Sequence, residues 1–315
     1  MNILENKVVA VTGGCGFIGS FLLKELLNIG VSKIIIIDDC SYGNKNNINL
    51  DDERIFLNDI SLNIANIDDI AIAIDGADYL FHLAAEKYNQ SKNNPLSIID
   101  SNISGTIKIA ESCLRVGVKK IVFSSSLYAY GKIKTLKLGE KLTPDPHTIY
   151  GISKLAGEQI IKQYHHKAFN FNILRYFFVY GPNQFAGSGY KSVIIKNFER
   201  MLASKPPIIN GDGLQTLDYS YVDDIVQGTI SAMVIEDNNH IINLGSGIPI
   251  TIKDLIQMMK KIANFNGDTL YREEDETAGT VRVCEIKKAK EILNYQPKIN
   301  IDEGLRRTYD WLKNE

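Results

Sequence analysis

One stretch near the amino terminus limits the possible folds more than any other part of the 315-residue chain. Residues 8–11 read Val-Val-Ala-Val, a short apolar run that predicts a strand buried on both faces of a sheet. From Phe17 onward, apolar residues recur with a helical period as far as Gly30, which predicts a helix ended by a glycine cap. A strand, a glycine-rich turn and a helix in this order predict an α/β fold with a doubly wound parallel sheet.

Three glycines in the turn predict a site for a dinucleotide. Gly13 permits the tight turn, Gly16 lets the backbone approach a pyrophosphate, and Gly19 lets the helix pack closely on the strand. The amino terminus of the helix then offers unpaired N–H groups to the phosphates. A glycine pattern alone also occurs in tight turns of unrelated α/β proteins. Here the strand before it, the helix after it and acidic residues farther on agree with the dinucleotide motif.

Acidic residues after the second predicted strand indicate which dinucleotide fits. Asp38 and Asp39 follow the apolar run 34–37, close to the spacing of about twenty residues that the motif requires. A carboxylate at this place hydrogen-bonds both ribose hydroxyls and repels a 2′-phosphate, so the sequence predicts NAD rather than NADP. Asp59 and Ile60, which follow the next predicted strand, are placed to contact the adenine edge.

Strands and helices alternate through residues 1–178, which we predict to form a Rossmann-type NAD-binding domain. The further elements expected are strands at 55–58, 79–83, 121–123, 171–176 and 241–244, and helices at 68–77, 95–116, 150–167, 252–263 and 286–293. Glycines and prolines interrupt the chain after residue 178, as is typical of a lobe that covers the substrate. We assign 179–214 and 249–315 to this smaller, interleaved α/β substrate-binding lobe, and about 215–248 to a segment that returns to the NAD-binding domain.

Charge and cysteine content exclude several classes of function. Lysine and arginine total 35 against 37 aspartate and glutamate residues, so no strong field favours nucleic acid or an anionic membrane. Cysteines 15, 40, 113 and 284 have no C-x-x-C spacing and no zinc-like cluster with histidine, so the sequence predicts no metal site. The first residues do not resemble a signal peptide, and no apolar run approaches membrane-spanning length. We therefore expect a cytoplasmic protein without a membrane partner.

A tyrosine and a lysine predict the chemistry. Tyr150 and Lys154 are four residues apart on one predicted helix, so their side chains share a face. A phenol has a pKa of about 10, and a lysine ammonium together with a positive nicotinamide ring lowers that pKa by stabilising the phenolate. The resulting base takes a proton from a sugar hydroxyl while hydride leaves the carbon. Serines 124–126 follow the fifth predicted strand, at the sheet edge where ligands bind. The alternatives are a solvated surface pair and a strand end that tolerates small polar residues.

Further motifs cover nearly the whole chain in a fixed order. They are Thr12-Gly-Gly-x-Gly-Phe-Ile-Gly19, Asp59-Ile60, His82-Leu-Ala-Ala85, Asn102, Ser124-Ser-Ser126, Tyr150-x-x-x-Lys154, Arg175-Tyr-Phe177, Tyr180-Gly-Pro182, Gly211-Asp-Gly213, Asp218-Tyr-x-Tyr-Val-Asp-Asp224 and Asn243-Leu-Gly-Ser-Gly247. In this order the motifs resemble those of the extended short-chain dehydrogenase/reductase family. The resemblance is to its branch of NAD-dependent nucleotide-sugar epimerases and dehydratases, which includes the UDP-glucose/UDP-galactose 4-epimerases.

The resemblance implies a role for each matching position. Ser126 hydrogen-bonds the reacting sugar oxygen, Tyr150 is the acid/base, and Lys154 also holds the nicotinamide ribose. The positions that match cofactor contacts are Gly13, Gly16, Phe17, Ile18, Gly19, Asp38, Asp39, Asp59, Ile60, Leu83, Ala84, Ala85, Lys87, Asn102, Ser124, Tyr150, Lys154, Tyr176 and Phe177. The positions expected at the substrate are Lys87, Ser126, Tyr150, Phe178, Lys191, Tyr219 and Arg282. In the family, the helices that match 95–116 and 150–167 form a four-helix interface, which implies a homodimer.

Departures from the family pattern favour one reaction. Dehydratases carry an Asp-Glu or Met-Glu pair after the Ser/Thr, because eliminating water needs a further acid and base. UDP-glucuronate decarboxylases usually carry glutamate directly after that serine. Leu127 and Tyr128 occupy these positions here and count against both reactions. Oxidation at C4 followed by return of hydride to the other face needs only the tyrosine, serine, lysine and NAD, and this reaction is 4-epimerisation.

The substrate end departs from the UDP-galactose 4-epimerases. Phe178 replaces an asparagine that touches the diphosphate sugar, and Leu217 replaces an arginine that grips a phosphate. Arg282 or Arg272 could supply the missing charge, and Lys191 is either a diphosphate contact or a solvated surface residue. The nucleotide base, the sugar and the reacting carbon therefore stay open.

The sequence thus predicts an NAD-dependent nucleotide-sugar 4-epimerase that retains and recycles NAD. One alternative is an oxidoreductase of the same family that releases NADH or reduces a keto sugar, and another is a dehydratase. An alternative of a different class is a non-catalytic NAD-binding scaffold. The intact set of Ser126, Tyr150 and Lys154 argues against the scaffold.

Overall fold

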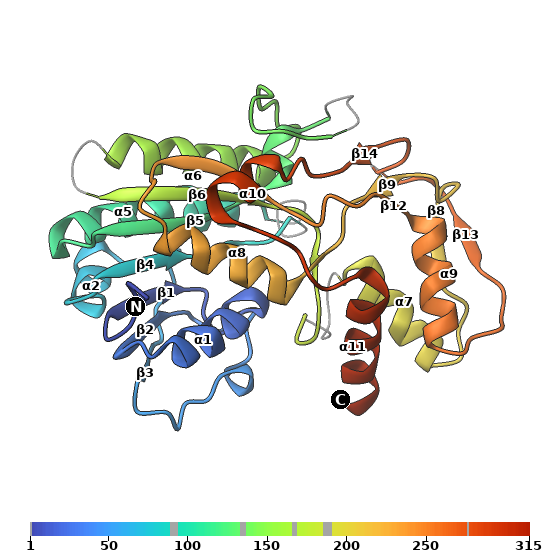
Figure 1. The fold of residues 1–315 in the computed structure, drawn as a ribbon, viewed down its shortest axis with the longest axis horizontal. Coiled ribbons are helices and arrows are strands. Elements are labelled where there is room, and N and C mark those ends of the chain that lie inside the picture. Colours follow the sequence, from blue (N-terminus) through green and yellow to red (C-terminus); the bar gives the residue numbers. More distant parts are fainter. Residues whose placement is uncertain (1, 89–93, 133–136, 166–168, 185–190, 276) are drawn as a thin grey trace.

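A seven-stranded parallel sheet forms the centre of the computed structural model, which describes residues 2–88, 94–132, 137–165, 169–184, 191–275 and 277–315 (Figure 1). Its strands are β1 (Val8–Thr12), β2 (Lys33–Ile37), β3 (Ile55–Asn58), β4 (Tyr79–His82), β5 (Lys120–Ser126), β6 (Asn170–Tyr176) and β11 (His240–Leu244). They lie in the order β11-β6-β5-β4-β1-β2-β3, and every neighbouring pair is parallel. This order confirms the predicted doubly wound fold, in which the strand order reverses beside β1.

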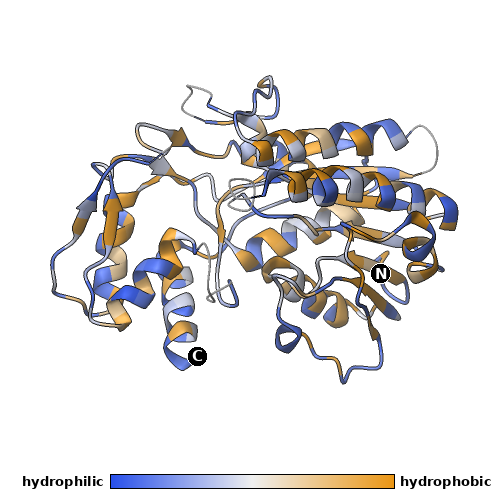
Figure 2. Ribbon diagram, turned by 180° about the vertical axis from the view of Figure 1, so that it is seen from behind, coloured by the Kyte–Doolittle hydropathy of each residue, from blue (hydrophilic) through white to orange (hydrophobic). Residues whose placement is uncertain are grey.

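Apolar runs form these strands because both faces of the sheet are covered. Ile34, Ile35, Ile36 and Ile37 on β2 are each at most 1 % exposed, so the strand needs no polar alternation. Figure 2 shows the strands of the sheet as mainly hydrophobic, while the helices around them carry residues of both kinds. The burial of two faces therefore explains why the sequence of β2 reads as one continuous apolar stretch.

Helices pack on both faces of the sheet (Figure 1). One face is covered by α1 (Phe17–Ile29) and α8 (Val222–Val234). The other face is covered by α2 (Ile67–Ala73), α5 (Gly105–Val116) and α6 (Ile149–His165). The predicted end of the first helix is confirmed, because Gly30 adopts the left-handed conformation with φ of +87°.

The predicted helix at 95–116 is not continuous. It divides into α4 (Pro95–Ile98), a π-helical segment η2 (Ile99–Ser104) and α5. The Asn102 side chain in η2 hydrogen-bonds the backbone N–H and C=O of Glu86, at 2.7 and 3.2 Å. Widened turns of this kind occur where a functional side chain must be placed, which periodicity in the sequence does not reveal. Two short helices, η1 (Lys45–Asn47) and η3 (Leu127–Tyr130), follow β2 and β5.

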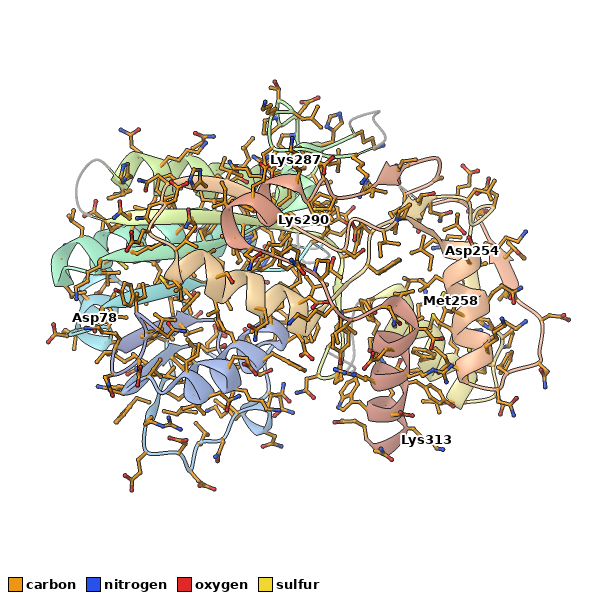
Figure 3. All side chains as sticks on the ribbon, viewed as in Figure 1. Asp78, Asp254, Met258, Lys287, Lys290 and Lys313 are labelled. Atoms are coloured by element: carbon orange, nitrogen blue, oxygen red, sulfur yellow. The ribbon has the colours of Figure 1, made fainter. Side chains whose placement is uncertain are left out.

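A second group of elements extends from the carboxyl edge of the sheet. It contains α7 (Val193–Leu202), α9 (Ile252–Ile262), α11 (Ile301–Asn314), β7 (Val179–Tyr180), β8 (Ile208–Asn210), β9 (Thr216–Leu217), β10 (Ser220–Tyr221), β12 (Ile250–Thr251), β13 (Leu270–Arg272) and β14 (Val281–Arg282). The sequence predicted α9 but missed α7 and α11, as well as α8 of the sheet domain. The buried core between the sheet, α1 and α8 continues without interruption into the lobe helices α7, α9 and α11. In Figure 3, Met258 on α9 lies toward this core, whereas Lys313 on α11 lies at the outer surface.

Helix α10 (Lys287–Leu293) packs against β11 and α8, although it follows the lobe strand β14 in the sequence. The carboxyl-terminal segment therefore passes over the sheet domain before it reaches α11 (Figure 1). Among the described residues, no helix combines the length and the apolar character needed to cross a bilayer.

Candidate active site

One cavity of about 1170 Å³ runs from the glycine-rich loop to the lobe. Its walls include the carboxyl ends of β2, β5 and β6, and parts of α7 and α11. The lining includes Gly13 of the glycine-rich loop and Trp311 on α11. This volume exceeds the range of roughly 300–1,000 Å³ that is usual for a single small ligand, so the cavity has room for a dinucleotide and a second molecule.

The glycine-rich loop forms a cradle that no side chain could enter. Gly13 has φ of +75°, and a Cβ atom on it would lie 2.7 Å from the Ala84 nitrogen. A Cβ atom on Gly19 would lie only 2.1 Å from the Gly13 oxygen. Gly13, Gly16, Phe17, Ile18 and Gly19 all line the cavity. The backbone of this loop and the first turn of α1 can therefore approach a pyrophosphate directly.

Acidic residues close one side of the adenosine end. Asp38 and Asp39 line the cavity at the end of β2. The Asp38 carboxylate accepts hydrogen bonds from the backbone N–H groups of Cys15 and Cys40, both at 2.8 Å. Burial raises the pKa of this carboxyl group, and the two backbone hydrogen bonds oppose the rise. Asp38 thus ties the glycine-rich loop to the loop after β2 and still presents its carboxylate to the cavity.

Two buried acceptors at the same end lack partners. Glu86 is 8 % exposed, and neither its Oε2 atom nor the Asn63 Oδ1 atom has a hydrogen-bond partner within the described chain. Both residues line the cavity. Burial raises the pKa of Glu86. Unpaired buried acceptors are costly, and the amino group and ribose hydroxyls of adenosine are donors that match them, so the lining fits NAD. Sequence analysis missed both residues, although each follows the end of a parallel strand.

Three of the predicted cofactor contacts, namely Asp59, Asn102 and Phe177, lie outside the described cavity lining. The Asp59 side chain is 70 % exposed, and its carboxylate lies 3.8 Å from Lys45 Nζ. Asn102 is buried one layer behind the wall, where it holds the backbone of Glu86. Phe177 is 0 % exposed in a small core, because side chains alternate along the extended backbone and Tyr176 takes the cavity side.

The remaining predicted cofactor residues lie along the cavity. They are Ile60, Leu83, Ala84, Ala85, Lys87, Ser124, Tyr150, Lys154 and Tyr176. Burial lowers the pKa of Lys87, and the adjacent Glu86 carboxylate opposes that shift. The Tyr176 hydroxyl is bonded to Thr229 at 2.8 Å, so its ring rather than its hydroxyl faces the ligand space.

Ser126, Tyr150 and Lys154 meet where β5 ends beside α6. The Ser126 side chain hydrogen-bonds the Tyr150 hydroxyl, which favours the phenolate. Lys154 is 3 % exposed, and its Nζ atom donates to the Ser124 carbonyl at 2.8 Å and lies 5.9 Å from the centre of the Tyr150 ring. All three side chains line the cavity. A hydroxyl, a phenol and an ammonium group are thus directed at one point of the ligand space.

The sequence predicts a lowered phenol pKa when a positive nicotinamide ring is bound, and the protein alone shows the opposite shift. Burial raises the pKa of Tyr150 to about 12, and the hydrogen bond from Ser126 offsets only part of that rise. Burial also lowers the pKa of Lys154 to about 7, against the opposing charge of Glu158. In the protein alone the phenol pKa is therefore raised, because burial outweighs the hydrogen bond from Ser126. A positive nicotinamide ring bound beside the phenol would favour the phenolate.

The predicted substrate residues divide into two groups. Phe178 and Tyr219 line the cavity with ring centres 5.8 Å apart. Lys191 also lines it, but its Nζ atom donates to both carboxylate oxygens of Glu199 at 2.6 Å, so its charge is already balanced.

Arg282 lies behind the described lining rather than in it. Its guanidinium carbon lies 5.4 Å from the centre of the Tyr128 ring, which does line the cavity. Arg282 is 8 % exposed, and no carboxylate of the described residues forms an ion pair with it. A nearly buried cation of this kind favours an anionic ligand. The alternative, Arg272, is exposed on β13.

Aromatic and polar residues that the sequence did not single out complete the walls. Tyr128 stacks on Tyr88 with ring centres 4.7 Å apart, and both rings contact the Tyr150 ring edge to face. Gln215 in the lobe is 3 % exposed and carries a buried Oε1 atom without a partner within the described chain. Lys196 on α7 also lines the cavity. No motif marks these positions, because they come from loops and from helices whose period was not recognised.

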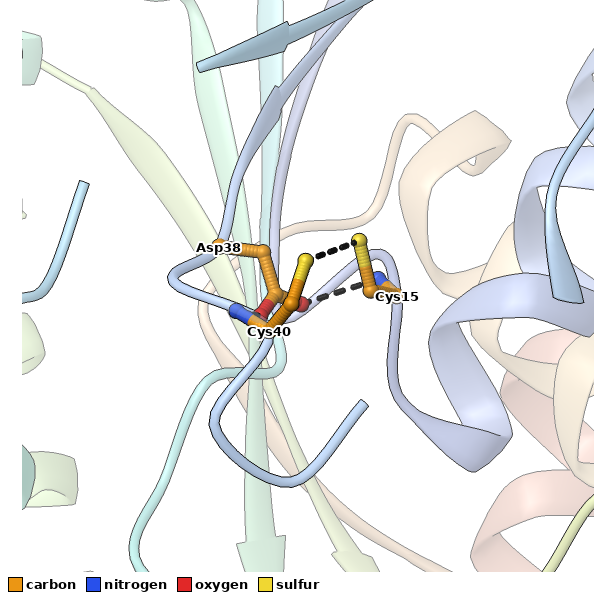
Figure 4. A group of neighbouring side chains, drawn as sticks. All are labelled: Cys15, Asp38 and Cys40. Atoms are coloured by element: carbon orange, nitrogen blue, oxygen red, sulfur yellow. Dashed lines mark hydrogen bonds between the residues drawn. The ribbon is translucent and has the colours of Figure 1, made fainter. Parts of the chain in front are cut away.

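The structure also brings together three groups that could hold a metal ion, which the cysteine spacing did not predict (Figure 4). They are the side chains of Cys15, Asp38 and Cys40, whose ligand atoms all lie within 4.8 Å of one another. The two cysteines come from different loops, so the fold and not the spacing in the sequence makes them neighbours.

Comparisons with known proteins agree with this geometry. Residues 9–245 match the family model described as the NAD dependent epimerase/dehydratase family. A Methanocaldococcus jannaschii protein whose provisional name is UDP-glucose 4-epimerase is 36 % identical over 98 % of this chain and 99 % of its own length. A UDP-glucuronate 4-epimerase from Thermodesulfobacterium geofontis is 33 % identical over 96 % of this chain and 95 % of its own.

A solved structure shares the whole architecture. It is the UDP-glucose 4-epimerase of Thermotoga maritima, crystallised with UDP-glucose. The two chains superpose with a TM-score of 0.91 at 30 % identity, and the match covers 98 % of this chain and 99 % of the other. The match therefore includes both the sheet and the lobe.

Proposed function

The chain belongs to the NAD-dependent epimerase/dehydratase family, and within it we propose that the protein catalyses the 4-epimerisation of a nucleotide-diphosphate sugar. The observation that carries the proposal is the meeting of Ser126, Tyr150 and Lys154 in a cavity with room for two ligands. The 4-epimerases among its relatives act on different sugars, so the sugar is left to the experiment.

The residues of the sheet edge would hold NAD. The glycine-rich loop receives the pyrophosphate, and Asp38 and Asp39 receive the adenosine ribose. Asn63 and Glu86 offer their unpaired acceptors at the same end. Lys154 holds the nicotinamide ribose beside the reacting groups. NAD, when bound, supplies a hydride acceptor that later returns the hydride.

Tyr150 moves the proton in this reaction. Its phenolate oxygen takes the proton of the sugar C4 hydroxyl as that carbon loses hydride, and a 4-keto sugar forms. Ser126 donates a hydrogen bond to the sugar O4 atom and keeps that atom within reach of Tyr150. After the keto sugar rotates within the cavity, Tyr150 returns the proton and C4 regains hydride on its opposite face. No net oxidation takes place, so the cofactor stays bound.

The residues after Ser126 support epimerisation over elimination of water. Leu127 is 3 % exposed within a small core, and Tyr128 is stacked between Tyr88 and Arg282. Neither side chain can act as the carboxyl acid that a dehydratase or decarboxylase places there. The aromatic pair instead forms a flat wall suited to a sugar ring.

A diphosphate at the substrate end needs positive charge. Arg282 would supply it, since it has no carboxylate partner among the described residues. Lys191 contributes less, because Glu199 already balances its charge. Phe178 and Tyr219 pack on the other side of this ligand space.

We propose a homodimer built on the neighbouring helices α4, α5 and α6. Five apolar side chains on α4, η2, α5 and α6 are exposed to solvent in the single chain, namely Leu96 (68 %), Ile99 (42 %), Ile107 (38 %), Ile149 (40 %) and Ile152 (46 %). An exposed apolar patch of this kind marks a protein interface. The double substitution of Leu96 and Ile152 by aspartate should convert the dimer to a monomer in light scattering; a wild-type monomer would remove the proposal.

We propose that residues 1–178 and about 215–248 belong to the NAD-binding domain and that 179–214 and 249–315 belong to the substrate lobe. Two parts depart from this division, because β9 and β10 lie with the lobe elements and α10 packs against β11 and α8. We also place the protein in the cytoplasm, because all four cysteines are free thiols, which suits a reducing compartment.

The test is proton NMR of the purified protein without added cofactor, mixed in turn with UDP-, dTDP-, GDP- and CDP-hexoses. We expect a second anomeric signal that grows to a fixed ratio with one of them, while no free NADH absorbs. Tyr150→Phe should abolish this signal and keep NAD bound, whereas Tyr164→Phe, on the same helix but outside the cavity lining, should turn over normally. Release of free NADH would instead establish an oxidoreductase. If the NAD-bound wild type gave no second anomeric signal with any of the sugars, the proposed epimerase activity would be wrong.

A further inference from the structure

Two thiols meet beside the glycine-rich loop (Figure 4). The Cys40 Sγ atom lies 3.1 Å from the Cys15 Sγ atom, and both cysteines are free. A disulfide bond is about 2.05 Å long, so the two sulfurs need to approach by only about 1 Å to form one. Cys15 is 0 % exposed, whereas Cys40 is half-buried, so a reagent from solvent reaches Cys40 first.

The backbone around the pair is fixed by one carboxylate. Asp38 accepts from the Cys15 N–H through Oδ2 and from the Cys40 N–H through Oδ1, both at 2.8 Å. Cys40 has φ of +54°, a conformation uncommon for any residue but glycine. The carboxylate therefore holds Cys40 in an unfavourable conformation that directs its thiol toward Cys15.

The rest of the loop after β2 is packed on Cys15 as well. The Asn44 N–H donates to the Cys15 carbonyl at 3.0 Å, and a Cβ atom on Gly43 would lie 2.6 Å from that same oxygen. A covalent bond between the sulfurs would thus join two segments that already touch. It would also fix the position of Asp38, the residue that we assign to the adenosine ribose.

We propose that Cys15 and Cys40 form a reversible dithiol–disulfide couple that controls the exchange of NAD, an inference whose second half rests on the proposed NAD site. Both segments line the adenosine end of the cavity, Cys15 directly and the Cys40 loop through Ser41, Tyr42 and Gly43. Cross-linking them prevents the loop from opening, so NAD passes in and out more slowly. In compartments that keep thiols reduced, disulfides are mostly transient and serve as sensors.

The oxidation balances with a peroxide as the oxidant. Cys40–SH reacts with hydrogen peroxide to give the sulfenic acid Cys40–SOH and one water. The Cys15 thiol, after losing its proton, attacks the Cys40 sulfur, and hydroxide leaves and is released as a second water. The sum is two thiols and one peroxide giving one disulfide and two waters. A dithiol reductant reverses it by thiol–disulfide exchange.

The surroundings set the rate of this reaction but not its end point. Burial raises the pKa of both thiols, and the neighbouring Asp38 carboxylate adds to the rise. Lys45 favours the thiolates and Asp59 opposes that of Cys40. Because the thiolate is the reactive form, oxidation is slow at neutral pH and speeds up as the pH rises.

A metal ion is the competing use of the same group, and the geometry favours the disulfide. Both oxygens of Asp38 already accept backbone hydrogen bonds, which leaves the carboxylate less free to act as a ligand. Zinc also requires both thiols to lose their protons, which their burial opposes.

The experiment treats the NAD-bound protein with hydrogen peroxide, blocks the remaining thiols under denaturing conditions, and maps peptides by mass spectrometry. We expect a peptide pair joined through Cys15 and Cys40 that disappears after dithiothreitol. Exchange of bound NAD for isotope-labelled NAD should slow by about tenfold in the oxidised protein and recover on reduction. Cys40→Ser should show neither effect, and Cys113→Ser, a buried cysteine on the other face of the sheet, should behave as wild type.

The absence of the joined peptide would overturn the couple, whatever the outcome for NAD. A joined peptide with an unchanged NAD exchange rate would overturn control of the cofactor. Binding of one zinc ion in the untreated protein, lost in Cys40→Ser and without any joined peptide, would overturn the disulfide in favour of a metal site. A protein that forms the disulfide but binds no NAD would contradict the proposed function and leave the thiol chemistry standing.

Discussion

The NAD end and the substrate end of the cavity are built in different ways. At the NAD end, main-chain atoms form much of the cavity surface, because the glycine-rich loop and the ends of the strands line it. At the substrate end, side chains from α7 and the loop after β6 line the cavity, and Arg282 on β14 lies behind this lining. Here a single partner decides what a residue can do, as Glu199 does for Lys191 and Tyr128 does for Arg282.

This difference indicates that substrate specificity can change by substitution more easily than NAD binding can. A backbone cradle admits few substitutions, because a Cβ atom on Gly13 or Gly19 would collide with main-chain atoms. A side-chain surface can be rebuilt one residue at a time, as Phe178 and Leu217 in place of the usual polar residues indicate. We therefore expect substitutions at the two ends to fail in different ways, the first through folding and NAD, the second through substrate affinity.

The strongest test of this contrast is Gly19→Ala. The new Cβ atom would lie 2.1 Å from the Gly13 oxygen and 2.8 Å from the Gly14 Cα atom, and main-chain atoms cannot easily give way. We expect the free energy of unfolding to fall by about 3 kcal/mol or more and NAD to be absent from the purified protein. Thermal unfolding and the NAD content measure both effects. Gly139→Ala is the control, since its nearest neighbour is a side-chain atom at 3.7 Å; equal effects of the two substitutions would refute a rigid cradle.

Arg282→Met tests the substrate end. The substitution keeps the length of the side chain next to Tyr128 but removes the only charge on it. We expect KM to rise by about 100-fold with kcat changed only a few-fold, since a charge-assisted contact to a phosphate is worth about 3 kcal/mol. Arg272→Met should leave KM nearly unchanged, because Arg272 is exposed on β13. A reversed result would assign the phosphate to Arg272.

The pH dependence of stability tests the polar interior under the NAD end. Burial lowers the pKa of His82 to about 3, and its ring bonds Thr12 at 2.7 Å and Thr106 at 3.1 Å. The unfolded chain takes up a proton at this histidine below a pH of about 6.5 while the folded chain does not, so stability falls as the pH falls from there toward 3. At a pH of about 5 the loss amounts to about 2 kcal/mol.

His82→Gln should remove this part of the pH dependence, as urea unfolding at a pH of about 7 and of about 5 would reveal. The matched control is His147→Gln, an exposed histidine in the loop before α6, which should retain the full wild-type dependence. If both variants keep it, the acid sensitivity originates elsewhere.

The smallest effect on KM is expected for two lysines, Lys191 just before α7 and Lys196 on α7. Lys191→Met should raise KM by no more than about threefold, because removing a balanced ion pair at a partly exposed site changes little. Lys196→Met should raise it more, since the described residues contain no acid paired with Lys196. Substrate titrations of the two variants decide the order, and a larger effect at Lys191 would mean that Glu199 releases it when substrate binds.

The NAD end could be predicted from the sequence because its requirements act on the backbone. A buried strand, three glycines and an acid at fixed spacing predict a doubly wound parallel fold, which the sheet confirms, and Asp38 and Tyr150 both line the cavity of this fold. The local environment could not be predicted in the same way. Asn102 lies behind the cavity wall, and the pKa of Tyr150 depends on the balance between burial and the hydrogen bond from Ser126.

The substrate end escaped prediction for a physical reason. Its helices α7 and α11 have a clear amphipathic period that was not recognised among the interrupted segments after residue 178, and its charges are defined by partners distant in the sequence. Glu199 is eight residues from Lys191, and Tyr128 is far from Arg282. Cys15 and Cys40 teach the same lesson, because no spacing rule connects two loops that only the fold brings together.

Trp311 gives the lobe a property of a different kind. It is the single tryptophan of the chain, its indole N–H donates to Glu315 at 3.0 Å, and it lines the cavity from the lobe helix α11. Indole emission depends on the polarity around the ring, so occupation of the lobe should change the intrinsic fluorescence without any label. The molecule thus carries an optical reporter at its substrate end, where ligands can be ranked by titration before any product is known.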